Sequence, residues 1–557
     1  MLNNRNVSRL VTALLLCSLF RIAEAQTTAT LFGVVRDGSG AVVPEAKITA
    51  RNTATSFSRT GSSNEAGAYL ITNLPVGPYS LLIEKVGFRQ FAQDGITLQV
   101  SQNARVDAVL VVGQVTDSIT ISEAAINVDT RGSTVGDVVD RVRIQELPLN
   151  GRNVMELSKT IPGIATVTAP TLETRGRDGS HVSVAGGRAT QNEIRFDGSS
   201  HVGLYHNSAL NLPSPDALQE FKVLTSNFTA EYGRYGGGVF IAVTRAGTNQ
   251  FHGSLWEYLR NKALNARNFF AVNVPDLKQN QFGFTFGGPV IHNRTFFFGS
   301  YQGTRIAQSQ LAASATPPTA AERGGDFSAS RNKPVDPLTQ QPFPNGKIPP
   351  ERFDRVAVAL LGKYVPLPNT PTGAFVALSP VPSNGNQFLF RVDHSFSANN
   401  SLDLRYFREN TDKTSQSGNI PHPDMRNPEW FKVRNWALHD THTFTPSLLN
   451  EFRIGINRNH SEVASQGTAQ LSDYGAIFPG VVTPQLPSLG VTGFFSISSN
   501  DRYGDPTNIY QLGDTLRWFH GKHSISLGGE FTRNEFFGYG SSGNPGVISF
   551  DGSITSN

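Results

Sequence analysis

Cysteine is almost absent from this sequence of 557 residues, in which Cys17 is the only one. It lies in an apolar run, residues 10–20, that follows two arginines and precedes the small residues Ala23 and Ala25. This order of basic, apolar and small residues indicates a secretory signal peptide that covers residues 1–25, with cleavage expected between Ala25 and Gln26. The mature chain would then have no disulfide, no thiol nucleophile and no cysteine metal site.

Long hydrophobic runs and concentrated charge are also missing. No later stretch approaches the roughly 18 consecutive apolar residues that a membrane-spanning helix needs. The net charge of +4 is small for this length, and no block of lysine or arginine concentrates it. Nucleic-acid binding therefore has little support. If this exported chain spans a membrane, it has to do so with the strands of a barrel.

The motifs of common enzyme active sites are missing as well. The sequence contains no glycine-rich phosphate loop, no HExxH helix and no nucleophile elbow. His439 and His442 are three residues apart, as are His520 and His523. On a strand this spacing places the two histidines on opposite faces, so they are not expected to share a metal ion. We therefore expect no enzyme activity, no cofactor and no metal site.

Residues 28–112 are predicted to form short strands separated by turns. The predicted strands cover residues 30–36, 46–52, 68–72, 79–86, 95–100 and 105–111. Such a series of short strands has the size of a small β-sandwich. GVVRDGSGAVVPEAKITA followed by NEAGAYLITNLPVGPYSLLIEKVGF resembles the carboxypeptidase-regulatory-like domain, a transthyretin-like sandwich, over residues 26–113. The resemblance implies no peptidase activity, and residues 26–113 contain no histidine.

An extended segment, VTDSITISE, follows the predicted sandwich within residues 114–127. One interpretation is a linker or a last strand of the sandwich. The segment also resembles the short stretch of TonB-dependent outer-membrane receptors that binds the periplasmic energiser protein. The residues that carry this resemblance are Asp117, Ser118, Ile119, Thr120 and Ile121. Strand addition suits such a segment, because main-chain hydrogen bonds supply the affinity.

Residues 128–247 are predicted to form an α+β domain. RIQELPLNGRNVMELSKTIPGI indicates two short helices, and VSVAGGRATQNEIRFDGSS indicates two short strands with turns. Four motifs stand in the order found in the plug domain of TonB-dependent receptors of the Oar-like subgroup. They are ELPLNGRN, Gly187-Arg188, Phe196-Asp197-Gly198 and EYGRYGGGVFIAVTRAGTNQFHG. In the last motif the glycines would let the backbone turn tightly or pack closely before the chain crosses into a barrel.

Polar residues of this domain have simpler expected roles. His181, His201 and His206 lie in polar stretches and are expected to be exposed loop histidines. Asp197 and Asp216 stand at predicted turns, where aspartate commonly accepts hydrogen bonds from nearby backbone.

Aromatic and apolar residues alternate with polar ones in residues 248–557. The apolar positions are Phe282, Phe284, Phe286, Phe388, Phe390, Val392, Phe452, Ile454, Ile456, Ile525, Leu527 and Phe531. This alternation is typical of a transmembrane β-barrel, although a half-buried soluble sheet has it too. Charged residues on the polar face and the tryptophans at 256, 436 and 518 near strand ends favour the barrel.

Long insertions separate these predicted strands, at residues 312–382, 410–430 and 461–508. In outer-membrane barrels such loops lie outside the cell, where they would capture a ligand. About nine or ten strands can be recognised, whereas plugged transporters have 22. The sequence also ends without a terminal aromatic strand. We therefore expect an incomplete barrel and an N-terminal portion of a longer protein.

The predicted fold is mainly β: an N-terminal β-sandwich, a small α+β plug domain and an incomplete transmembrane antiparallel β-barrel. The resemblance implies a bacterial outer-membrane receptor that takes up a ligand with energy from a TonB-type complex. The ligand would be an oligosaccharide, a peptide or a metal chelate, and the sandwich and plug would lie on the periplasmic side. A non-transporting surface protein for adhesion or matrix assembly is the alternative. A soluble multidomain β-protein is a third possibility.

Overall fold

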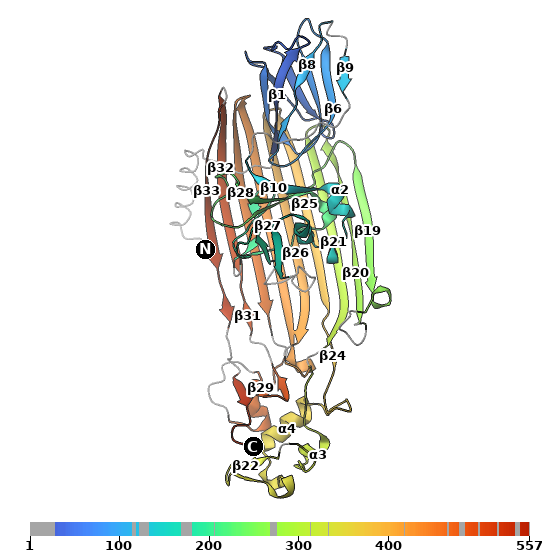
Figure 1. Ribbon diagram of the computed structural model, residues 1–557, viewed down its shortest axis with the longest axis vertical. Helices are drawn as coiled ribbons and strands as arrows, with labels where there is room; N and C mark the ends of the chain where they lie inside the picture. Colours follow the sequence, from blue (N-terminus) through green and yellow to red (C-terminus); the bar gives the residue numbers. More distant parts are fainter. Residues whose placement is uncertain are drawn as a thin grey trace, which may run out of the picture.

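The computed structural model describes residues 28–113, 118–121, 133–168, 181–204, 207–267, 274, 276–311, 314–331, 333–416, 418–464, 467–477, 485–498, 502–520, 523–540 and 546–555. Figure 1 shows a β-domain at one end, a tall sheet with a small domain against it, and packed loops at the other end. Among these residues no helix is both long and apolar enough to cross a membrane.

The N-terminal domain is a sandwich of two sheets, with strand orders β4-β1-β7, where β8 also pairs with β1, and β3-β2-β5-β6-β9. Its strands are β1 Thr28–Asp37, β2 Lys47–Asn52, β3 Ser58–Ser62, β4 Ala68–Pro75, β5 Gly77–Glu84, β6 Gln90–Leu98, β7 Asn103–Arg105, β8 Ala108–Leu110 and β9 Ser118–Ile121. Alternate residues such as Ile48, Leu81 and Ile83 face the core between the sheets.

One sandwich strand, β3, is absent from the sequence prediction. Its residues, SRTGS, contain no apolar side chain, so the usual alternation of a half-buried strand is missing. Two tertiary contacts hold it: antiparallel pairing with β2, and buried Arg59, whose Nε donates to the carbonyl of Asn73 at 3.2 Å.

The second domain has a five-stranded sheet in the order β10-β17-β18-β13-β14, with short helices beside it. Its elements are β10 Val135–Asp140, α2 Arg141–Glu146, η1 Asn150–Arg152, η2 Val154–Thr160, β11 Ile164–Thr168, β12 His181–Val184, β13 Glu193–Phe196, β14 Ser199–Ser200, β15 Val202–Gly203, β16 Ser208–Ala209, η4 Pro215–Ala217, β17 Leu218–Ser226 and β18 Val239–Thr244. The helices around Pro148 and the two strands β12 and β13 confirm the α+β prediction for this region.

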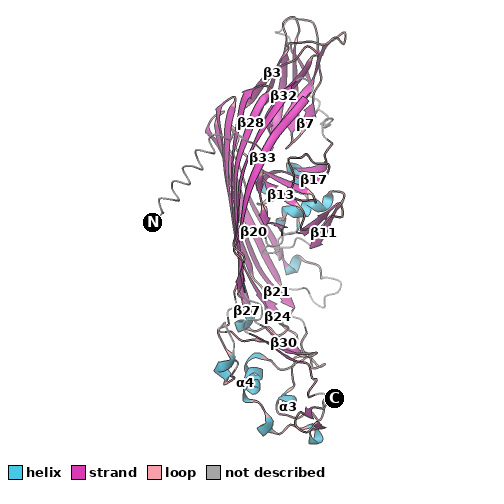
Figure 2. Ribbon diagram, turned by 90° about the vertical axis from the view of Figure 1, so that its left-hand side faces the viewer, coloured by secondary structure: helices cyan, strands magenta, loops and turns pink. Residues whose placement is uncertain are grey.

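The tall sheet contains nine long antiparallel strands in the part of the chain that the structure describes. They are β19 His252–Asn261, β20 Leu277–Ile291, β21 Thr295–Leu311, β25 Ser383–Ser397, β26 Asn400–Gln416, β27 Arg426–Thr445, β28 Leu448–Val463, β32 Thr507–His520 and β33 His523–Phe536. The sheet is not closed within the described residues, because β19 pairs only with β20 and β33 only with β32. It curves around the second domain, as Figure 2 shows.

The two faces of this sheet differ in the way the sequence predicts. Gln281 faces the second domain and is 2% exposed, whereas Phe284 faces outward and is 44% exposed. Phe388, Phe390, Leu527 and Phe531 are also exposed, on the outward face. The outward face therefore carries an apolar belt of the kind that a lipid bilayer covers.

The connections between the long strands differ sharply at the two ends of the sheet. At the sandwich end they are as short as residues 292–294, 398–399 and 446–447, and at the other end they span 312–382, 417–425 and 464–506. Short turns at one rim and long loops at the other are typical of outer-membrane barrels.

The long loops pack together into a separate loop domain with its own core. Its elements are α3 Ala320–Arg323, β22 Val335–Asp336, β23 Gln341–Pro342, η6 Pro344–Gly346, η7 Pro350–Arg352, α4 Arg355–Tyr364, η8 Pro423–Met425, η9 Leu471–Tyr474, β29 Ser488–Val491, β30 Phe495–Ile497 and β35 Val547–Phe550. The short strands β24 Leu378–Pro380, β31 Tyr503–Gly504 and β34 Tyr539–Gly540 extend the tall sheet, and η5 Lys262–Leu264 follows β19. Tyr364, Met425, Leu471 and Ile497 come from three different loops and bury one another. Isolated apolar residues in proline-rich sequence give no periodic signal, so the sequence did not predict this core.

Candidate functional site at the face between the small domain and the sheet

The crossing from the small domain to the sheet runs from β18 to β19. Gly237 lies so close to the residues just before β13 that a Cβ there would be 2.5 Å from the Asn192 Oδ1. At Gly247 a Cβ would be 2.4 Å from the carbonyl oxygen of Phe297 in β21. A side chain at either position would have to displace its neighbours. Gly233 and Gly236, in contrast, face open space.

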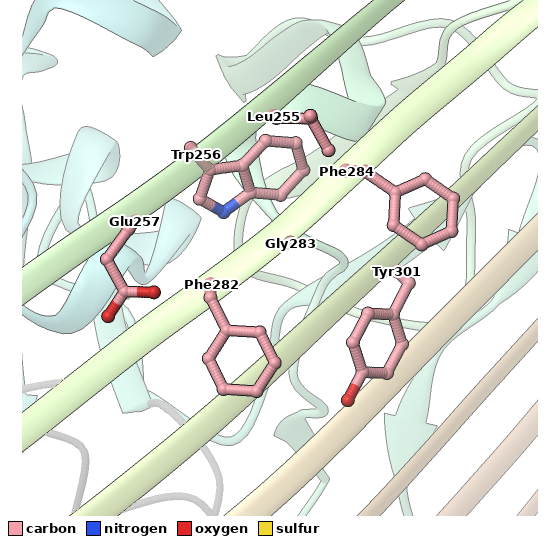
Figure 3. A pocket seen from close by; sticks show the side chains of 7 residues that line it. All are labelled: Leu255, Trp256, Glu257, Phe282, Gly283, Phe284 and Tyr301. Carbon is pink, nitrogen blue, oxygen red and sulfur yellow. The ribbon is translucent and has the colours of Figure 1, made fainter.

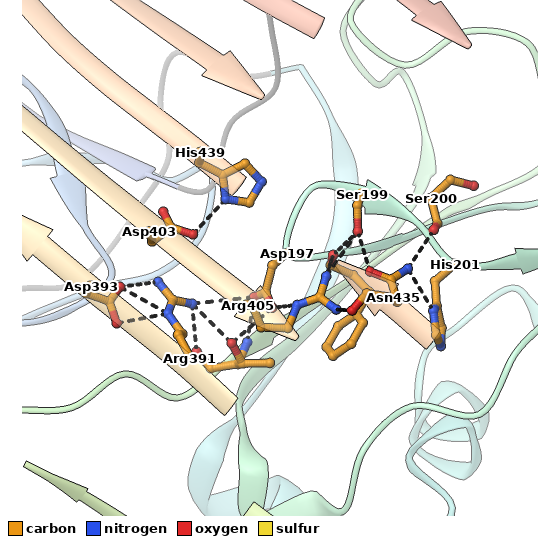
Figure 4. A network of polar contacts seen from close by, with 12 residues as sticks. Asp197, Ser199, Ser200, His201, Arg391, Asp393, Asp403, Arg405, Asn435 and His439 are labelled. Carbon is orange, nitrogen blue, oxygen red and sulfur yellow. Dashed lines mark hydrogen bonds and ion pairs between the residues drawn. The ribbon is translucent and has the colours of Figure 1, made fainter. Parts of the chain in front are cut away.

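A buried network of charges begins at the turn that joins β13 to β14 (Figure 4). Asp197 is 1% exposed and accepts hydrogen bonds from the Thr244 backbone N–H at 2.8 Å and from its hydroxyl at 3.0 Å. It also pairs across the domain boundary with the Nε of Arg405 at 3.0 Å and an Nη of Arg391 at 3.6 Å. The prediction of a merely local role for Asp197 was wrong, because the sequence does not show that two sheet arginines face this turn.

Arg405 is the most enclosed of these cations, with a fully buried side chain. Its guanidinium lies 3.8 Å from the ring centroid of Phe196 and donates to the Phe196 carbonyl at 2.9 Å and the Ser199 hydroxyl at 3.0 Å. Planar stacking and several donors in a fixed fork suit arginine to such a site. The small domain thus holds one sheet arginine by charge, stacking and hydrogen bonds together.

A second cluster surrounds Arg195 of β13. This arginine pairs with Glu193 beside it and with Glu530 of β33, the latter at 2.8 Å. Glu530 also pairs with Arg453 of β28. Because Arg195 and Arg453 are almost fully buried, each depends on its carboxylate partners. This cluster joins the small domain to β28 and to β33, the last long strand of the sheet.

The histidines of the chain correct some predictions and confirm one. His201 is fully buried, with Nε2 2.9 Å from the carbonyl oxygen of Asn211, and is not an exposed loop histidine. Burial lowers the pKa of His201 to about 3, so the ring is neutral at physiological pH. His439 faces inward to Asp403, whereas His442 contacts Asn400 at the other face, as the spacing predicts. For His520 and His523 the prediction of opposite faces was wrong, because they end and begin neighbouring strands and are register partners across the turn between β32 and β33. His181 begins strand β12 and is half-buried, so it is not an exposed loop histidine either, while His206 lies outside the described residues.

The LNGRN motif supplies a third contact with the sheet. Gly151 and Arg152 both have positive φ angles, of 63° and 55°, and form a sharp turn. The turn brings the Gly151 carbonyl to the Gln281 side chain at 3.0 Å and lets Arg152 pair with Asp216. The guanidinium of Arg152 also lies 4.1 Å from the ring centroid of Tyr258 on the first sheet strand. Asp216 therefore has a partner beyond its own turn.

The sandwich contacts the small domain through a turn centred on Val100. Its fully buried side chain packs on Leu224 and the outer face of β18. The Val100 backbone N–H donates to Glu220 at 2.6 Å, and its carbonyl accepts from Lys222 at 2.9 Å. The sandwich also meets the rim of the sheet, where the Thr28 hydroxyl donates to Glu451 at 3.2 Å.

Glu220 makes this contact dependent on pH. Burial raises its pKa to about 7, against smaller opposing effects of the Val100 hydrogen bond and the charge of Lys222. Because folding raises this pKa, the protonated carboxyl of Glu220 stabilises the folded state fully below the ordinary pKa of 4.5. This contribution to stability is lost as pH rises through about 7. We expect the Val100 amide to exchange faster at pH 8 than at pH 5, after correction for intrinsic rates. Glu220→Gln should remove this pH dependence. Hydrogen exchange of the Val100 amide in both proteins, at pH 5 and pH 8, is the measurement. An equal pH dependence in both proteins would contradict the assignment.

Family models match three successive parts of the chain. A carboxypeptidase regulatory-like domain matches residues 30–111, a TonB-dependent receptor plug domain matches residues 129–239, and an outer membrane beta barrel domain matches residues 243–557. The chain belongs to the TonB-dependent outer-membrane receptors. The small domain is therefore the plug, the tall sheet is part of the barrel, and the receptor lies in the outer membrane.

One curated relative and two solved structures are similar to part of this receptor. The TonB-dependent transporter Oar of Myxococcus xanthus is 26% identical over 300 residues, or 51% of this chain and 27% of Oar. The outer membrane transporter YddB from Escherichia coli has a TM-score of 0.48 at 11% identity, over 72% of this chain and 48% of YddB. The siderophore receptor PirA from Acinetobacter baumannii gives 0.42 at 11% identity, over 72% and 48%. The chain thus spans about a quarter to a half of their lengths.

The predicted energiser-binding segment lies on the sandwich. Ser118–Ile121 forms β9, which pairs in parallel with Gln90–Gln93 of β6 at the edge of the second sandwich sheet. These four residues therefore form a last strand of the sandwich, which was one of the two interpretations of the sequence. Asp117 and the predicted cleavage site at Ala25 and Gln26 lie outside the described residues.

Two of the hollows on the described part of the receptor are of interest as binding sites. One, of about 550 Å³, lies beside the outward side chains of Phe282, Phe284 and Tyr301 (Figure 3), where the outer-membrane lipid surrounds the barrel. The other, of about 430 Å³, lies in the loop domain. Its lining residues are Ser314, Thr316, Asn419, Gly490, Val491, Thr492, Gly493, Phe494, Phe495, Ser496 and Ser549. Four separate connections supply this uncharged, hydroxyl-rich lining.

Proposed function

We propose that this receptor is an energy-coupled transporter, in which the sandwich covers residues 26–113, the energiser-binding linker 114–127, the plug 128–247 and the barrel 248–557. The external loop domain binds an oligosaccharide, a peptide or a metal chelate. A TonB-type complex then pulls on Asp117–Ile121, and the plug moves to open a path. Nothing in this scheme needs an enzyme activity or a cofactor of the receptor itself.

Buried polar links across the plug–barrel contact support this proposal, beside an apolar cluster in which Phe196 of the plug packs on Phe407 of the barrel. The polar links are ion pairs and amide hydrogen bonds: Asp197 to Arg405, Arg195 to Glu530, and Asn211 to Glu409 at 3.1 Å. Water can replace such partners when the plug shifts, whereas an apolar contact of the same size would lose its burial. Polar links that water can replace are what we expect of a plug that moves.

Two substitutions at Ile119 test the role of the proposed energiser-binding segment. Ile119→Pro removes a main-chain donor that strand addition requires, whereas Ile119→Val preserves it. We expect Ile119→Pro to abolish cellular retention of labelled oligosaccharides, peptides or ferric chelates that cells with the unaltered receptor retain, while Ile119→Val retains them.

Fractionation of outer membranes is the control, since both variants should reach the membrane at the normal level. Retention by Ile119→Pro cells equal to that of unaltered cells would contradict energised uptake through this segment. If deletion of the receptor changes only the attachment of cells to surfaces and leaves uptake unchanged, the non-transporting role in adhesion or matrix assembly would be favoured.

A further inference from the structure

The edge of β6 is a strand-binding surface with an occupant from the same chain. Four consecutive residues of each strand are in register, from Gln90 with Ser118 to Gln93 with Ile121. On its other side β6 pairs with β5, so β9 covers the edge that β6 would otherwise present. An uncovered sheet edge displays main-chain donors and acceptors that pair readily with any extended segment.

The sandwich that holds β9 is itself fixed to both other parts of the receptor. Val100 joins it to the plug through Glu220 and Lys222. On the rim of the barrel, Thr28 contacts Glu451, and the Asn249 backbone N–H donates to the carbonyl of Ala54 at 3.0 Å. A pull on β9 in its docked position therefore acts first on the sandwich, and through these contacts on the immobile barrel.

We infer that β6 of the sandwich holds the energiser-binding segment as an edge strand, and that this strand has to leave β6 before the energiser can move the plug. The inference rests on the proposed function of the segment. Energiser binding and docking on β6 both use the main chain of the same four residues. Once β9 is released, force passes along the chain from Ile121 to β10 of the plug instead of into the sandwich.

A reversible cross-link between β6 and β9 tests this inference. Ala92 and Thr120 are register partners, Ala92 is only half-buried, and the expected mature chain contains no other cysteine. Ala92→Cys/Thr120→Cys would lock β9 in place when oxidised. Thr49→Cys/Thr60→Cys, between register partners of β2 and β3, is the matched control. The probe is the purified periplasmic C-terminal domain of the host's TonB-type energiser, added to the full chain in detergent.

We expect the first pair to form a disulfide without added energiser and to bind the energiser domain at least about tenfold more weakly when oxidised. Reductant should restore binding, and the control pair should bind equally in both states. Equal binding by the oxidised and reduced first pair would overturn the need for release.

Two other outcomes separate the docking from the proposed function. Failure of the disulfide to form would overturn the docking of β9 itself. A disulfide that forms readily, with no energiser binding by reduced, oxidised or unaltered protein, would instead refute the proposed role of the segment and the release step with it.

Discussion

Replacing Asp197 with alanine is expected to weaken the attachment of the plug to the barrel by about 3–5 kcal/mol, the usual cost of removing one partner of a buried ion pair. The reason is the environment of Arg405, which is fully buried and has Asp197 as its closest carboxylate partner in the described structure. The same change removes both hydrogen bonds that hold Thr244 at the end of β18. Hydrogen exchange of the β13 and β14 amides would measure the loss.

A half-exposed ion pair of the plug provides the matched control. Asp137 and Arg143 lie 3.6 Å apart with side chains 40% and 39% exposed. Asp137→Ala should cost less than about 1 kcal/mol, because solvent screens such pairs. Equal exchange rates in Asp197→Ala and Asp137→Ala would show that the buried network does not hold the plug.

Replacing Arg195 with methionine is expected to cost a similar amount, about 3 kcal/mol or more. Methionine fills much of the volume but leaves buried Glu193 without the cation beside it and breaks the link to Glu530 on β33. We expect the plug to loosen first on the side of the sheet that contains β28, β32 and β33. Limited proteolysis of the plug in detergent, compared with thermal unfolding, would detect this local release.

Two further variants define what Arg195 contributes. Arg195→Lys keeps the charge but cannot reach Glu193, Glu530 and the Gly198 carbonyl together, so an intermediate loss is expected. Arg141→Met, on the exposed face of α2, should have little effect. A double-mutant cycle with Glu530→Gln should give a coupling of about 1–3 kcal/mol. A coupling near zero would mean that the two residues act independently.

The two clusters suggest how the plug is held and released. One links the turn after β13 to β25 and β26, and the other links β13 itself to β28 and β33, through charges that lie away from the surrounding solvent. Breaking one pair alone is costly, but joint hydration of all partners in a cluster recovers much of that cost. A plug held in this way stays in place until a directed force or entering water disturbs a whole cluster.

Local sequence patterns determined the main architecture of this protein. Alternation around Phe284, Phe390 and Ile454 predicted the barrel strands and the side that each residue faces, because side chains of a strand alternate with a period of two. The order of motifs from ELPLNGRN to the Gly247 crossing predicted the plug and its family. Such features can be recognised in the sequence because they depend on residues close together in the chain.

Tertiary structure alone decided which residues form the candidate site. Asp197 and Arg405 are more than two hundred residues apart, as are Arg195 and Glu530, and no local pattern announces their pairing. Burial of His201 and the core of the loop domain depend in the same way on surfaces brought together by the fold. The segment Ser118–Ile121 shows both levels. Its extended form follows from its sequence, whereas its place on β6 follows from the open edge of a neighbouring sheet, a physical condition that only the folded sandwich creates.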